Sequence, residues 1–150
     1  MTEFGVRGIA LDVEGNLPVV LLESADGKLL PIWIGGPEAY SIGMALKNYK
    51  PPRPMTHDLL ISIVHGLGAK FRRVVISGIS NGTFYALIHL ELKGELVVID
   101  ARPSDTIALA LRSKVPIFVE DSIPVFSPND AETMELRRRL REIKPEDMGF

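Results

Sequence analysis

Hydrophobic residues in the second half of the chain follow first a strand period and then a helix period. Residues 83–92 read TFYALIHLEL, and apolar side chains at alternate positions from Phe84 to Leu90 predict a half-buried β-strand. Further along, Ile107, Ala110 and Leu111 have the i, i+3, i+4 spacing that is typical of an amphipathic helix. The pattern therefore predicts strands that lead into a helix.

Turn residues divide this stretch into three strands and set the start of the helix. Asn81-Gly82 is a strong two-residue hairpin signal between a strand at 73–79 and the strand at 83–92. Lys93-Gly94 predicts a second turn before a β-branched strand at 95–99. Pro103 suits the first turn of the helix, where a backbone N–H is not needed.

The same order occurs earlier in the chain, at an offset of 65 residues. RGIALDVEGNLPVVLLE (7–23) aligns with RRVVISGISNGTFYALIH (72–89), and PIWIGGPEAYSIGMALKNYKP (31–51) aligns with LVVIDARPSDTIALALRSKVP (96–116). Two copies with so long a period indicate a fused pair of supersecondary units rather than a solenoid. We therefore predict an α+β fold in which duplicated β3α2 repeats share one twisted sheet.

A second helix is expected after each first helix. In residues 55–70 we expect Thr56 to be the N-cap, with one apolar face formed by Leu60, Ile63, Val64 and Leu67. In residues 130–143 the stripe is Leu136, Leu140 and Ile143, and the high charge density predicts an exposed helix. The expected domain spans residues 1–120, with repeats at about 6–67 and 71–120, and residues 121–150 form a mostly helical C-terminal extension.

Composition and charge exclude several classes of protein. The chain is 46% hydrophobic and 24% charged, which is ordinary for a globular domain, and it has no cysteine for disulfides or thiolate metal sites. The net charge of −2 argues against a surface built wholly for nucleic acid. We find no signal-peptide pattern and no apolar run near the ~20 residues of a membrane span. A cytoplasmic protein without a membrane partner is expected.

Polar residues gather where a strand passes into a helix. Asp100 ends a strand, and Arg102, Ser104 and Asp105 open the following helix. Asp105 and Ser104 are also good helix-start residues, so simple capping is one interpretation. Arg102 is harder to explain in that way, because a cation at a helix N-terminus opposes the helix dipole. It should pair with Asp100 or Asp105, or bind an anion.

The matching junction of the first copy supplies a further carboxylate, Glu38, and the second helix of that copy supplies His57-Asp58. Imidazole takes up or releases protons near neutral pH, so His57 is a candidate general base. Asp58 in a first helical turn is favourable on dipole grounds alone. Phosphate loops, zinc helices and nucleophile elbows are absent from the sequence.

Several segments in this order resemble the bifunctional nuclease domain family. They are LPIWIGGPEAYSIGMAL, KPPRPMTHDLL, NGTFYALI, IDARPSDTIALALR and PIFV, and the resemblance covers residues 6–120. Plant members of that family are described as degrading both DNA and RNA. The departure is GGPEA, where a bulky residue near Pro37 would be expected.

The resemblance implies phosphodiester hydrolysis, with nucleic acid as partner. Its candidate catalytic residues are Glu38, His57, Asp58 and Asp105, and its candidate substrate-binding residues are Arg53, Arg102 and Ser104. Metal assistance would need carboxylates that converge on Mg²⁺ or Mn²⁺, although no spacing in the sequence requires a cofactor. We expect all the candidates except Arg53 to gather around one cleft.

The sequence leaves two functional classes open. The alternative to a nuclease is a non-catalytic regulatory module that uses the same junctions to bind a small anion or a protein. In either case we expect a homodimer, because strands such as Val19–Leu22 and Thr83–Leu92 carry apolar residues on both faces.

Overall fold

The strands of the chain join in one mixed sheet, which confirms the expected α+β class. The computed structural model describes residues 1–150. The strands are β1 (Thr2–Asp12), β2 (Leu17–Ser24), β3 (Leu29–Trp33), β4 (Ala69–Ser80), β5 (Thr83–Leu92), β6 (Glu95–Ala101), β7 (Ile117–Val119) and β8 (Leu140–Ile143). Their order is β3-β2-β1-β7-β4-β5-β6. Strand β1 pairs with β7 through residues 2–4 and with β8 through residues 9–12. Only the β4–β7 pair is parallel.

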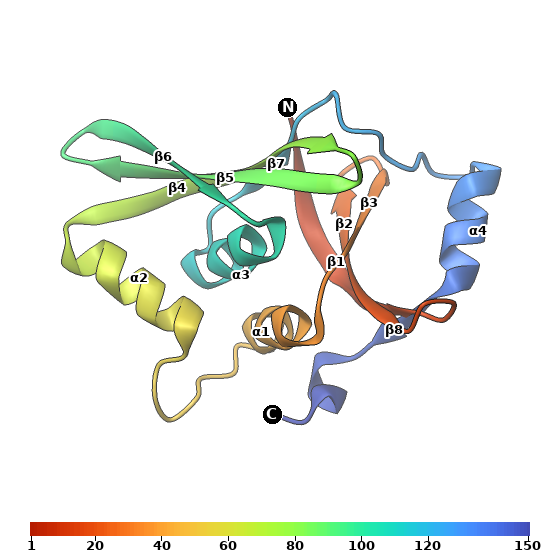
Figure 1. Ribbon diagram of the computed structural model, residues 1–150, viewed down its shortest axis with the longest axis horizontal. Helices are drawn as coiled ribbons and strands as arrows, with labels where there is room; N and C mark the ends of the chain where they lie inside the picture. The colour runs from red at the N-terminus through yellow and green to blue at the C-terminus, as the bar shows by residue number, and fades with distance from the viewer.

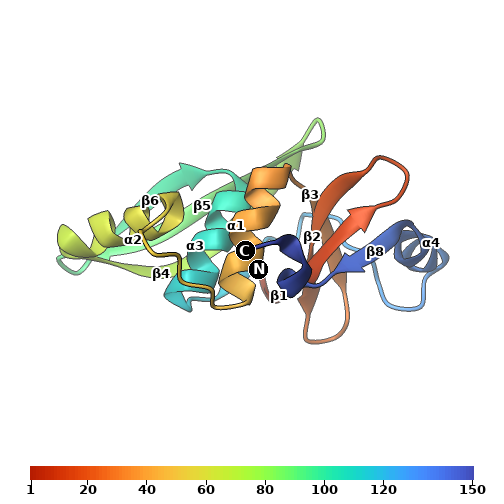
Figure 2. The same cartoon turned by 90° about the horizontal axis from the view of Figure 1, so that it is seen from below.

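Three helices pack on one face of this sheet, and a fourth stands apart beside β1–β3 (Figure 1). The helices are α1 (Gly36–Leu46), α2 (Thr56–Gly66), α3 (Pro103–Ser113) and α4 (Ala131–Arg139), followed by the 3₁₀ turn η1 (Pro145–Met148). Helices α1 and α3 lie side by side (Figure 2). Their fully buried residues Ile42 and Ile107 join the main core beneath the strands. None of the helices is both long and apolar enough to span a membrane.

The predicted turns form where the sequence placed them. Asn81 and Gly82 have φ of 51° and 77°, and Lys93 and Gly94 have φ of 52° and 79°. Positive φ at both central residues suits the right-handed twist of a hairpin, and glycine adopts it without a Cβ penalty. Strand β5 runs from Thr83 to Leu92, as expected.

Both halves of the chain run as three antiparallel strands followed by a helix. The halves differ after that helix. The first continues into α2, whereas the second returns to the sheet as β7 before α4. The duplication at a 65-residue offset, with its two superposable β3α2 copies, stays a prediction.

The expected helix at 130–143 is wrong in its second part. Helix α4 ends at Arg139, and residues 140–143 form strand β8, with Leu140 opposite Asp12 and Ile143 opposite Ile9. The free edge of β1 offers backbone partners here, and sheet pairing prevails over the helical spacing of the leucines. The C-terminal extension is thus part of the same sheet.

The apolar face expected on the helix at 55–70 is largely exposed. Leu60 and Ile63 are solvent-exposed and Leu67 is 75% exposed, whereas Val64 packs against the core together with Ile61. The N-cap is Met55 rather than Thr56, and the Asp58 carboxylate accepts a hydrogen bond from the Met55 backbone N–H at 2.9 Å. Helix α2 therefore shows an apolar stripe to solvent.

Helix α4 is not simply an exposed helix, because Leu136 is only 4% exposed. Leu136 lines a small cavity together with Leu29 and Ala10 from the sheet. Beside it, Arg139 at the end of α4 donates to the buried Asp12 at 2.7 Å. Asp12 also accepts from the Trp33 indole at 2.9 Å, and these donors hold the pKa of Asp12 below its usual value.

We expect Leu136→Ala to lower the free energy of unfolding by about 2–4 kcal/mol, because it removes a buried side chain between α4 and the sheet. Met134→Ala on the same helix is the control, since Met134 is 52% exposed and should cost less than ~0.5 kcal/mol. Urea denaturation followed by the fluorescence of the single tryptophan, Trp33, measures both variants. Equal stability of the two variants would show that α4 does not dock.

Candidate active site at the helix junction

The two strand-to-helix junctions line the same pair of cavities. Helix α1 begins three residues after β3, and α3 begins two residues after β6. Two neighbouring cavities, of about 350 and 270 Å³, share Glu38 from α1 and Arg102 from the N-cap of α3 as lining residues. The junctions therefore face each other, as the sequence led us to expect.

Arg102 is paired with Asp105, one turn into α3. Its Nε lies 2.9 Å from Asp105 Oδ2 and its Nη2 lies 3.3 Å from Oδ1. This ion pair resolves the conflict between a cation and the helix N-terminus, because the carboxylate in the first turn compensates for both. It is one of the two pairings predicted for Arg102. The guanidinium remains mostly exposed, with Nη1 free.

The carboxylate of Asp105 also holds His57, at the start of α2. His57 Nε2 lies 2.9 Å from Asp105 Oδ1, and His57 Nδ1 lies 2.7 Å from the Ser41 hydroxyl on α1. A carboxylate can only accept, so Nε2 carries the hydrogen, and the Ser41 hydroxyl is then free to donate to Nδ1. One histidine thus connects three helices.

Arg112, near the end of α3, completes the connection. Its Nη2 donates to the Ser41 backbone oxygen at 3.0 Å and to the Ser41 hydroxyl at 3.1 Å, and its Nε lies 3.3 Å from Asp58 Oδ1. We call this set of six side chains the helix-junction network. Its members are Arg102, Asp105, His57, Ser41, Arg112 and Asp58.

Burial and ion pairing shift the pKa values of Asp105 and Arg112 in opposite directions. Burial by itself would raise the pKa of Asp105, but the hydrogen bonds from Arg102 and His57 outweigh it and the pKa lies below its usual value. Burial lowers the pKa of Arg112, and Asp58 partly offsets that effect. Asp105 is therefore a carboxylate at neutral pH and keeps both of its partners.

Glu38 is the one acidic side chain of the cleft that makes no hydrogen bond or ion pair with the protein. Its carboxylate folds back over Gly35, and a Cβ at Gly35 would lie only 2.2 Å from Glu38 Oε1. A larger residue at position 35 would push the carboxylate away. The Glu38 charge is near enough to Arg102 to favour the protonated guanidinium. This leaves a free carboxylate beside a guanidinium.

The structure brings together most, but not all, of the predicted site residues. Glu38, His57, Arg102, Ser104 and Asp105 line the two neighbouring cavities. Asp58 instead borders a different cavity of about 610 Å³, where it faces Arg112. Arg53 is exposed on the loop between α1 and α2 and makes no ion pair.

Two members of the network were not among the predicted residues, namely Ser41 and Arg112. The sequence carried a signal for Arg112, because it follows Asp105 by two helical turns on an otherwise apolar helix and so shares its face. Ser41 gave no such signal, since nothing in its surroundings distinguishes it from an ordinary helix serine. No three histidine, aspartate or glutamate side chains come together in a way that could hold a metal ion.

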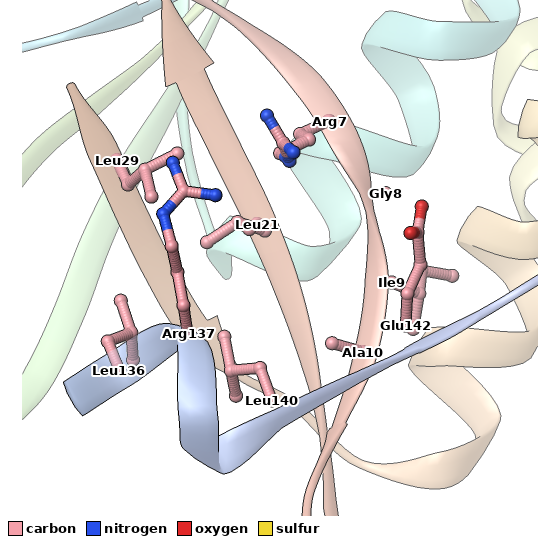
Figure 3. Close-up of a pocket in the computed structure, with 10 residues that line it drawn as sticks. All are labelled: Arg7, Gly8, Ile9, Ala10, Leu21, Leu29, Leu136, Arg137, Leu140 and Glu142. Atoms are coloured by element: carbon pink, nitrogen blue, oxygen red, sulfur yellow. The ribbon is translucent and has the colours of Figure 1, made fainter. Parts of the chain in front are cut away.

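A further cavity, of about 160 Å³, lies between the outer face of β1–β3 and the C-terminal segment (Figure 3). Six of its ten lining residues are hydrophobic, and Arg7, Arg137 and Glu142 are among the others. Arg7 is paired with Glu23 at 2.8 Å. None of the predicted site residues lines this cavity, so the helix junction is the stronger candidate for chemistry.

Comparison with known proteins supports the resemblance seen in the sequence. The chain matches the family described as "Bifunctional nuclease domain" over residues 19–126. It is 42% identical over 124 residues to an uncharacterized protein of Mycobacterium tuberculosis, covering 82% of this chain and 74% of that protein.

Plant relatives carry the name of an activity. The chain is 31% identical over 108 residues to bifunctional nuclease 1 of Oryza sativa subsp. japonica, and 31% identical over 116 residues to bifunctional nuclease 2 of Arabidopsis thaliana. Each match covers 70% of this chain but only 33% and 35% of the respective plant protein. The family match over residues 19–126 includes the whole helix junction.

We expect Asp105→Asn to lower the free energy of unfolding at neutral pH by about 1–3 kcal/mol, because both Arg102 and His57 lose a charged partner. Since the pKa of Asp105 is depressed in the folded protein, this contribution is fully present above about pH 4 and is lost as the pH falls through the folded pKa. The difference from the native protein should therefore shrink in acid. Urea denaturation at pH 7 and below pH 4 measures it.

Asp100→Asn is the matched control, because Asp100 is an exposed carboxylate at the end of β6 without an ion pair. It should change stability by less than ~0.5 kcal/mol at either pH. A constant difference between Asp105→Asn and the native protein across this pH range would contradict the depressed pKa.

Proposed function

The chain belongs to the bifunctional nuclease domain family, and from this premise we propose that it hydrolyses phosphodiester bonds of DNA or RNA at the helix junction. The observation that supports the proposal most is the juxtaposition of a guanidinium with a free N–H, a free carboxylate and a histidine in one cleft. A cation for the phosphate, a base for water and an acid for the leaving oxygen are what this reaction needs.

Each residue has a proposed role. Arg102 binds a non-bridging phosphate oxygen through Nη1, which no protein group uses. Glu38 accepts a proton from the water whose oxygen attacks phosphorus. His57 donates its Nε2 proton to the ester oxygen as that oxygen's bond to phosphorus breaks, and it does so as the imidazolium, for which the Ser41 hydroxyl must turn and accept at Nδ1. Asp105 holds Arg102 and His57 in place and is a positioning residue.

The cleft offers only one carboxylate, Glu38, as a ligand for a divalent cation. Among the carboxylates of the cleft only Glu38 is unpaired, because both oxygens of Asp105 already accept hydrogen bonds. Any Mg²⁺ or Mn²⁺ would therefore be shared between Glu38 and the substrate phosphate, as is usual for Mg²⁺.

The second candidate function is a non-catalytic module that binds a small anion or a protein. The observation that favours it is the use of both ring nitrogens of His57 within the helix-junction network, which leaves neither nitrogen free for substrate. The nuclease proposal requires Nε2 to leave Asp105 during the reaction. We propose the cytoplasm as the setting of either function.

We also propose that the chain forms a homodimer through the exposed apolar stripe of α2. Leu59, Leu60, Ile63 and Leu67 form that stripe, and β6 is the free edge of the sheet in the same half of the molecule. The stripe carries no charged side chain, so two copies could meet there without repulsion. Covering these residues in a symmetric pair would explain an apolar helix with no buried residue.

For the nuclease proposal, we expect His57→Asn to slow cleavage of a single-stranded oligonucleotide by about 10²–10⁴-fold, because it removes the proposed acid. His65→Asn is the matched control, since His65 is an exposed histidine on the same helix and should keep full activity. Gel analysis of end-labelled substrate gives both rates. Cleavage at the native rate by His57→Asn would point to the binding-module alternative or to a contaminating nuclease.

The same assay in EDTA tests whether cleavage needs a divalent cation. If side chains alone supply the acid and the base, cleavage persists when divalent ions are removed. Loss of cleavage in EDTA that Mg²⁺ or Mn²⁺ restores, together with weaker restoration in Glu38→Gln, would make Glu38 a cation ligand instead of a base.

For the dimer, we expect light scattering at micromolar concentration to give twice the 16.5 kDa chain mass, and Leu67→Ser to give the chain mass itself. Leu67 is 75% exposed, so the substitution should leave the fold intact. Val13→Ser, at another exposed apolar residue far from α2, is the control and should stay dimeric. A native protein of 16.5 kDa would refute the dimer.

A further inference from the structure

The larger of the two neighbouring cavities has an apolar wall that the proposed chemistry does not use. The hydrophobic residues of this wall are Ile32, Trp33 and Ile34, at the end of β3 and just after it, and Phe84, at the start of β5. Ser104 and Arg102 lie among the residues that complete the cavity. Gly35 and Gly82 also line it and contribute no side chains. The cavity measures about 350 Å³, within the range of small-molecule sites.

Two polar groups in this cavity have unused hydrogen-bonding capacity. Ser104 is only 7% exposed, yet its hydroxyl makes no hydrogen bond within the protein and is not cut off from solvent. Arg102 uses Nε and Nη2 for Asp105 and leaves Nη1 free. The Ser104 hydroxyl therefore has no protein partner and is open to a hydrogen bond with a ligand or water.

These features fit a flat aromatic group that carries polar atoms on its edge and a phosphate nearby. An aromatic base can stack on Phe84, bond to Ser104 through its edge, and place its phosphate at Arg102. We infer that this cavity receives one unpaired nucleobase of the substrate, next to the scissile phosphate. This inference rests on the proposed function and narrows its preferred substrate to single-stranded nucleic acid, because a base within a duplex must first be unpaired and unstacked, which costs free energy.

The test compares two single-stranded oligonucleotides with the same phosphates by fluorescence anisotropy. One has normal bases, and the other has abasic residues at its internal positions. We expect the native protein to bind the normal oligonucleotide about tenfold more tightly, in line with the loss of one stacked base. Phe84→Leu should remove this difference, because leucine keeps an apolar contact with the core but has no aromatic face.

Two further variants control the comparison. Tyr85→Leu changes the adjacent aromatic residue, which points to the opposite face of β5, and should keep the tenfold difference. Ser104→Ala should weaken binding of the normal oligonucleotide and leave binding of the abasic one unchanged. Because Ser104→Ala barely alters packing, it carries the test if Phe84→Leu melts below the assay temperature.

Equal binding of the normal and abasic oligonucleotides by the native protein would overturn the inference, and so would equal affinity for a single strand and its duplex. Either result leaves the proposed function standing when cleavage still depends on His57. Conversely, a base-dependent difference that Phe84→Leu removes, without any His57-dependent cleavage, would keep the base site and reject the nuclease.

Discussion

The hydrogen bond between His57 and Asp105 is the contact that links the placement of α2 to the proposed chemistry. Helix α2 has no buried residue and touches the core mainly through Ile61 and Val64, so apolar packing alone fixes it weakly. The 2.9 Å contact ties α2 to α3, and Ser41 ties both to α1. Because Asp105 also holds Arg102, the same carboxylate that positions a helix determines where a phosphate could bind. The Asp105 carboxylate therefore serves both the packing of the helices and the proposed chemistry.

This double use of Asp105 would allow a chain with a net charge of −2 to act on a polyanion, as proposed. Its affinity for phosphate would come from one guanidinium held beside a helix N-terminus, with a free Nη1, rather than from a broad basic surface. The neighbouring carboxylate, Glu38, would repel phosphate in water, yet it is the group that a hydrolytic reaction needs close to phosphorus. Gly35 gives that carboxylate its place, because any larger residue would collide with it. In the proposed function, this cleft would favour reaction over tight binding.

Much of the fold followed from local patterns in the sequence. The turns at Asn81-Gly82 and Lys93-Gly94, strand β5 and the start of α3 at Pro103 are set by residues adjacent in the chain, and all form as expected. Pairing of Arg102 with Asp105 is also local, one helical turn apart. Sequence reasoning failed where distant segments compete. Leu136, Leu140 and Ile143 have a helical spacing, but residues 140–143 pair with the open edge of β1 and form strand β8. Likewise Asp58 is adjacent to His57 in sequence but turns to Arg112 at another cavity, which only the packing of α2 on α3 could decide.

The most direct measurement is a double-mutant cycle on kcat/KM for oligonucleotide cleavage, with His57→Asn, Arg102→Ala and the two combined. Residues that act as a unit on one transition state are strongly non-additive. If the helix-junction network is the active site, each single variant should lose at least about a hundredfold, and the double variant should be little slower than the slower single variant. Single variants that cleave at the native rate, or losses that simply multiply in the double variant, would contradict a shared catalytic role for these residues.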